Sequence, residues 1–160
     1  MSRTPIDTSS IIQYLKGCRT LMSGKQAEYY QWVLDNGKYF KGTDRNKEME
    51  KELIKNKHPH KEKACYYNSQ MLLIDLDCND FEYYEGWYIP KGLIPIEHGF
   101  IVHKGKVIDL TINGRGEVVE YFGVKIPTSF IRKRLINEGI ADYSLVWFWE
   151  SLQKKVQKNG

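Results

Sequence analysis

The sequence has few cysteines, few prolines and no long apolar run. Among its 160 residues are three cysteines and five prolines. A small, odd number of cysteines excludes a scaffold built on disulfides. The longest apolar runs, 71–74 and 145–149, are too short to cross a bilayer, and residues 1–10 lack the apolar segment of a signal peptide. We therefore expect a cytoplasmic protein with no membrane partner.

The chain also lacks a long face of one charge. It has 24 Lys and Arg against 20 Asp and Glu, and segments 41–63 and 151–160 each carry a net charge of +3. Both segments have the composition of solvated surface, so the charge indicates no nucleic-acid partner. A hydrophobic content of 41% is enough for a core and excludes general disorder.

Apolar spacing predicts helices at both ends of the chain and strands between them. The expected helices cover 8–23, 25–36, 45–57, 65–75, 128–136 and a final segment for which Asp142 is the expected cap. The expected strands cover 81–89, 94–103, 106–111 and 118–124. Grouped strands are typical of the α+β class. We expect an antiparallel sheet of about four strands packed against helix 65–75, in one domain over 1–160 with a helical part at 1–57, a central part at 58–125 and C-terminal helices at 126–160.

Cys65 stands at the start of a predicted helix, after an irregular loop in which Pro59 favours extended backbone. A thiol in this position feels the positive end of the helix dipole and free backbone amides, which favour the nucleophilic thiolate. The backbone N–H of Cys65 would also point toward an oxyanion on an attacked carbonyl group. Cys65 is therefore the candidate nucleophile.

His98 is the candidate base for this thiol. Lys104 and Gly105 have the composition of a two-residue hairpin turn, which would pair residue 103 with 106 and residue 100 with 109. His98 and Asp109 would then be diagonal neighbours on one sheet face, with Asp109 accepting the imidazole N–H. A three-residue loop would place Asp109 on the other face.

This order of cysteine, histidine and aspartate resembles the transglutaminase-like and papain-like cysteine hydrolase superfamily. Segments 97–100 (Glu-His-Gly-Phe) and 106–111 (Lys-Val-Ile-Asp-Leu-Thr) are similar to that superfamily's His-apolar and Val-Ile-Asp-Pro-Thr stretch. The resemblance covers roughly residues 63–125. It implies that Cys65 is the nucleophile, His98 the general base and acid, and Asp109 the residue that orients His98.

The second oxyanion donor is open. Papain-like enzymes place a glutamine shortly before the cysteine, and residues 59–64 contain none. His60 or a more distant side chain, Asn56 or Tyr88, would have to replace it.

An aromatic strand precedes His98 in the sequence. Alternation places Tyr84 and Tyr88 on one face and Tyr83 and Trp87 on the other. One face is expected to be core, and the other to wall a cleft beside the thiol and bind an apolar or planar part of the substrate. Trp87 and Tyr88 are therefore substrate-binding candidates, whereas Glu85 and Glu97 are expected to be exposed strand acids.

The remaining cysteines and histidines are weaker candidates for a functional role. Cys18 lies on the apolar face of its predicted helix and is expected in the core, and Cys78 is expected to be a loop thiol. His58 and His60, together with Cys65, His98 or His103, form an alternative zinc site. That site would take Cys65 and His98 away from catalysis, so we expect neither a metal nor a cofactor.

These residues predict a cysteine-dependent enzyme that transfers acyl groups and hydrolyses an amide in a protein or peptide substrate. Peptide, isopeptide and glutamine side-chain amides all stay open, as does transfer to an amine. The competing hypothesis is a non-catalytic binding or inhibitor module on the same fold, of a host-interacting or phage type. The sequence does not indicate an oligomeric state.

Overall fold

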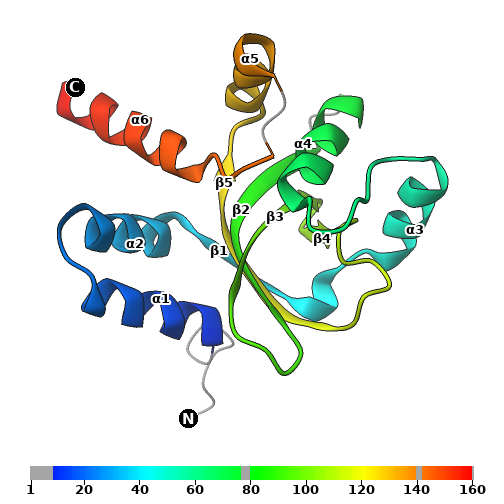
Figure 1. Ribbon diagram of the computed structural model, residues 1–160, viewed down its shortest axis with the longest axis horizontal. Helices are drawn as coiled ribbons and strands as arrows, with labels where there is room; N and C mark the ends of the chain where they lie inside the picture. The colour runs from blue at the N-terminus through cyan, green and yellow to red at the C-terminus, as the bar shows by residue number, and fades with distance from the viewer. Residues whose placement is uncertain (1–8, 77–79, 140–141, 160) are drawn as a thin grey trace.

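A computed structural model describes residues 9–76, 80–139 and 142–159. In these residues, six α-helices lie around one antiparallel sheet (Figure 1). The helices are α1 (Ser10–Leu21), α2 (Gly24–Asn36), α3 (Lys47–Lys55), α4 (Cys65–Leu76), α5 (Thr128–Glu138) and α6 (Val146–Asn159). The strands are β1 (Lys38–Lys41), β2 (Phe81–Pro90), β3 (Ile96–His103), β4 (Lys106–Ile108) and β5 (Val118–Ile126), and a 3-10 helix, η1 (Gly42–Asp44), follows β1.

The α+β class is confirmed, but the sheet has five strands in place of about four. The additional strand, β1, has only four residues and lies in the part of the chain expected to be helical. It forms through pairing with the distant β5 at the sheet edge, which no local pattern indicates. In the part of the chain that the structure describes, no helix is both long and apolar enough to span a membrane.

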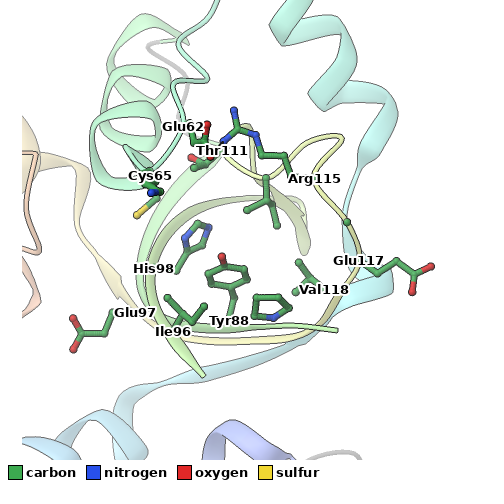
Figure 2. A pocket seen from close by; sticks show the side chains of 14 residues that line it. Glu62, Cys65, Tyr88, Ile96, Glu97, His98, Thr111, Arg115, Glu117 and Val118 are labelled. Carbon is green, nitrogen blue, oxygen red and sulfur yellow. Dashed lines mark ion pairs between the residues drawn. The ribbon is translucent and has the colours of Figure 1, made fainter. Parts of the chain in front are cut away.

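The sheet has the order β1-β5-β2-β3-β4 and curls around one of its own faces (Figure 2). At the centre of β2, Gly86 pairs with His98 of β3 on one side and with Gly123 of β5 on the other. A Cβ atom added at Gly86 would lie 2.0 Å from the carbonyl oxygen of Phe122, so only glycine allows this close approach. This close contact between β2 and β5 lies at Gly86, the residue that pairs with His98.

The aromatic side chains of β2 alternate between the two faces of the sheet, as predicted, but both faces are packed. Tyr83 and Trp87 point toward the helices α1, α2 and α4 and join the larger core. Tyr84 points into the curl, where it contacts Phe100 and Phe40, and Tyr88 lies partly buried at the edge of the same cluster.

Two buried acids of the sheet cap helices. Glu120 of β5 accepts hydrogen bonds from the Ser9 hydroxyl at 2.8 Å and the Ile11 N–H at 2.7 Å, at the start of α1. Glu85 of β2 accepts the N–H groups of Leu145 and Val146 at the start of α6, each at 2.8 Å. The prediction that Glu85 is exposed is therefore wrong. Asp142, the expected cap of the last helix, is exposed, and α6 begins four residues later.

Replacing Gly86 tests the close approach of β2 and β5. Gly86→Ala is expected to lower the free energy of unfolding by about 3 kcal/mol, because its methyl group overlaps backbone atoms that cannot move independently. Urea denaturation measures this change. The control is Gly17→Ala in α1, where an added Cβ meets no atom within 4 Å, and a gain of up to about 1 kcal/mol is expected. Equal stability of Gly86→Ala and the wild type would contradict the close approach.

Candidate active site

Cys65 occupies the first position of α4, as predicted, and its side chain is buried. The loop before it is held by Asn68, whose side-chain amide donates to the Lys61 carbonyl at 2.8 Å and accepts from the Lys61 N–H at 3.1 Å. Asn68 also donates to the Thr111 hydroxyl at 2.9 Å, two positions beyond Asp109. One buried amide thus ties together the loop before the thiol, the helix that carries it and the strand end that carries the aspartate.

The β3–β4 hairpin has the predicted register. Lys104 and Gly105 form its two-residue turn, and both have positive φ, of 50° and 78°. His103 pairs with Lys106, and Ile101 pairs with Ile108. His98 and Asp109 therefore share a face, and His98 Nε2 lies 2.6 Å from Asp109 Oδ2.

Asp109 is buried, and hydrogen bonds hold both its side chain and its backbone. The Tyr121 hydroxyl donates to Asp109 Oδ2 at 2.9 Å, and the backbone N–H of Asp109 donates to Glu50 Oε2 at 3.0 Å. Burial and the charge of Asp109 raise the pKa of Tyr121 well above its ordinary value, so this hydroxyl keeps its proton. The other carboxylate oxygen, Oδ1, is buried, and no described residue donates a hydrogen bond to it. The carboxylate is thus held in place with its charge close to His98.

His98 is held as a cation. Burial alone lowers its pKa, because the protein interior disfavours the charged imidazolium. The negative charge of Asp109, the hydrogen bond to Asp109 and the neighbouring Cys65 outweigh burial and raise the pKa of His98 to about 10. Because Nε2 is engaged by Asp109, Nδ1 is the nitrogen left for the thiol.

A cavity of about 380 Å³ opens beside Cys65 and His98. Figure 2 shows both residues at its rim and Tyr88 inside it, next to His98; the ring centroids of Tyr88 and His98 are 4.2 Å apart. Its apolar lining residues are Pro90, Ile96, Ile112 and Val118. At the mouth, Arg115 lies 3.5 Å from Glu62, so the two loops that border the cavity are joined by an ion pair.

The other predicted binding residues lie in different places. Tyr88 lines the cavity, whereas Trp87 is 4% exposed and packs on the opposite face of the sheet. His60 is exposed, with its Nδ1 3.0 Å from the His58 carbonyl oxygen, and does not line the cavity. The structure therefore brings Tyr88, but neither His60 nor Trp87, into the cavity beside the thiol.

Among the described residues, the other cysteine and the other histidines do not line this cavity. Cys18 is only partly buried, in place of the expected core position, and Cys78 lies outside the described residues. His58 Nδ1 lies 3.5 Å from a carboxylate oxygen of Asp75. Among the described residues, no three His, Cys, Asp or Glu side chains are placed to hold a metal ion.

The sequence did not predict the role of Glu50, whose carboxylate accepts a hydrogen bond from the backbone N–H of Asp109. Glu50 of α3 is 0% exposed and binds Arg45 through two hydrogen bonds, at 2.5 and 3.1 Å. Glu50 also accepts the Asn113 amide at 3.0 Å in addition to the Asp109 N–H. A signal was present, because Glu50 occupies the same helix face as Leu53, three positions later, which is buried too.

Known proteins add nothing to the resemblance that the sequence suggests. A scan against models of protein families and searches of curated proteins and solved structures find no match to the chain. The placement of Cys65, His98 and Asp109 is therefore the basis for inferring a function.

Removing the charge of Glu50 tests its supporting role. Glu50→Gln is expected to lower the free energy of unfolding by about 3–5 kcal/mol, because it leaves Arg45 charged and buried without its partner. The measurement is urea denaturation. The control is Glu52→Gln, an exposed acid on the same helix, with an expected change of less than about 0.5 kcal/mol. Similar free energies of unfolding for the two variants would show that the charge of Glu50 does not stabilise the fold.

The raised pKa of His98 predicts that stability falls as the pH rises. In the unfolded chain His98 has its ordinary pKa of 6.5, and in the folded protein about 10. The stabilisation from protonated His98 is therefore complete below pH 6.5 and is lost progressively as the pH rises to about 10. Urea denaturation over this range should show a steeper loss of stability for the wild type than for His98→Gln. Parallel pH profiles would mean that His98 is not held as a cation.

Proposed function

We propose that the protein is a cysteine-dependent hydrolase that cleaves an amide bond of a protein or peptide substrate, with Cys65 as nucleophile, His98 as proton carrier and Asp109 as the residue that orients His98. One observation carries this proposal: a buried His98–Asp109 ion pair lies beside a thiol at the start of a helix, at the rim of a cavity. Neither a metal nor a cofactor is required for this chemistry.

The acylation step uses the charged pair directly. The positive charge of His98 favours the thiolate of Cys65. The sulfur forms a bond to the amide carbonyl carbon, and the imidazolium gives its proton to the amide nitrogen as the carbon–nitrogen bond breaks. An amine leaves and a thioester remains on Cys65, with His98 now neutral and still held by Asp109.

The deacylation step reverses the direction of proton transfer. Neutral His98 takes a proton from water, the water oxygen bonds to the thioester carbon, and the carbon–sulfur bond breaks. The products are a carboxylic acid and the original pair of thiolate and imidazolium. Water is the proposed acceptor because the cavity mouth carries the solvent-exposed side chains of Glu62 and Arg115.

Two donors are available for the oxyanion. The backbone N–H of Cys65 belongs to the first turn of α4, where amides have no acceptor within the helix. The second donor is the Tyr88 hydroxyl, which lies in the cavity and takes the place of the glutamine of papain-like enzymes. Burial and the charges of Asp109 and Cys65 raise the pKa of Tyr88, so its hydroxyl stays protonated as a donor must.

Alkylation by iodoacetamide at pH 6 tests the activated thiol. Cys65 is expected to react at least about tenfold faster in the wild type than in His98→Ala, because a thiol without its cationic partner is almost fully protonated at this pH. Mass spectrometry of peptides follows Cys65, with Cys18 as an internal reference. The matched control is His103→Ala, which removes the half-buried histidine at the other end of β3 and should leave the rate unchanged.

An ester substrate separates catalysis from binding. With 4-nitrophenyl acetate, Cys65 should carry an acetyl group that disappears as water hydrolyses the thioester, and neither event should occur in Cys65→Ala. A reactive Cys65 that never acquires or never releases the acetyl group would favour the non-catalytic binding module. A Cys65 whose alkylation is independent of His98 would overturn the proposal.

A further inference from the structure

A second, narrow hollow borders the cavity through Glu97, which lines both. Its lining includes Tyr29, Tyr66, Trp87, Glu97, Ser144 and Trp147, and we call it the Glu97 groove. Tyr66 directly follows the thiol and Glu97 directly precedes His98, so both reacting side chains have a neighbour in this groove. Glu97 also borders the cavity, and Figure 2 shows its carboxylate pointing away from it.

The Glu97 groove combines exposed aromatic surface with an acid that has no ion-pair partner. Trp147 stacks on Tyr29 with ring centroids 3.8 Å apart and remains 45% exposed. Glu97 is exposed, and no Lys or Arg among the described residues forms an ion pair with it. The hollow holds only about 10 Å³, so a ligand would lie at its mouth, where Glu97 and Trp147 are both accessible.

Nearby acids raise the pKa of the two tyrosines of the Glu97 groove. Burial raises the pKa of Tyr66, and the charges of Cys65, Glu85 and Glu97 raise it further. The pKa of Tyr29 is likewise raised by burial, Glu85 and Glu97. Glu85 is saturated by its hydrogen bonds at the start of α6, which leaves Glu97 as the carboxylate free to bind a ligand.

The other carboxylates that line the cavity already have cationic partners. Glu62 pairs with Arg115, and Glu117 lies 3.1 Å from Lys91. Glu97, which borders both the cavity and the groove, is therefore the acid that a cationic group of a ligand could contact.

We propose that the Glu97 groove binds a positively charged side chain of the substrate, so that the amide attacked by Cys65 lies next to a lysine or arginine residue. This inference rests on the proposed function and adds the substrate class to it. A carboxylate beside aromatic rings is the combination that attracts ammonium and guanidinium groups, because ring faces and carboxylate both present negative potential to the cation.

Matched alkylating reagents test the groove without a known substrate. The first is a chloroacetamide with a four-carbon arm ending in an ammonium group, and the second has the same arm ending in a hydroxyl group. At low salt, the ammonium reagent is expected to alkylate Cys65 about tenfold faster than the hydroxyl reagent. The preference should decrease as sodium chloride is added, because salt screens a partly exposed charge pair.

Two variants assign the preference to the groove. Glu97→Gln should bring the ratio of the two rates close to one, and Trp147→Leu should reduce it. Glu52→Gln, which removes an exposed acid on α3, should keep the wild-type ratio. The ratio is taken within each variant and referred to that variant's own rate with unsubstituted chloroacetamide, and the thermal midpoint shows whether the variant is folded.

The outcomes separate this inference from the proposed function. Equal rates for the two reagents on a wild-type Cys65 that reacts rapidly with chloroacetamide would overturn the cation site and leave the hydrolase proposal standing. A preference that Glu97→Gln does not remove would also overturn it. A slow reaction of Cys65 with chloroacetamide itself would overturn the hydrolase proposal, and the ratio of the other two rates would still decide whether the groove binds cations.

Discussion

The buried ion pair between His98 and Asp109 is the interaction on which the rest of the site depends. Taking two charges out of water costs several kcal/mol for each ion, so the pair persists only where geometry and additional hydrogen bonds offset that cost. The 2.6 Å contact, the Tyr121 hydroxyl and the neighbouring thiol provide this compensation. All of it requires the hairpin register, since a shift of one residue would turn Asp109 to the other face of the sheet.

Buried acids recur as the means by which distant segments are joined. Glu50 connects α3 and Arg45 to the backbone of Asp109, and Glu85 and Glu120 connect the sheet to the first residues of α6 and α1. Each of these carboxylates accepts a hydrogen bond from a backbone N–H group. Glu85 and Glu120 do so at the start of a helix, where N–H groups have no acceptor within the helix and the helix dipole favours negative charge. The same logic applies to Cys65, whose thiolate would occupy the start of α4.

The residues next to the reacting groups in the chain give the proposed chemistry a direction. Cys65 and His98 line the cavity, and their chain neighbours Tyr66 and Glu97 line the Glu97 groove. A substrate bound across both would place a cationic group at Glu97 while its amide lies at Cys65. Selectivity would then come from Glu97.

The sequence by itself determined the α+β class, the helix start at Cys65 and the pairing of His98 with Asp109. These depend on local rules: strand alternation has a period of two, and a two-residue turn with positive φ sets the register. Only the tertiary structure decided that β1 joins the sheet, that Tyr88 rather than His60 or Trp87 enters the cavity, and that Glu50 and Glu85 are buried. Glu50 meets Asp109 across 59 positions of the chain, and Glu85 meets Leu145 across 60. The burial of such a side chain is set by which remote segment packs over it, and that depends on the whole chain rather than on the pattern around the residue.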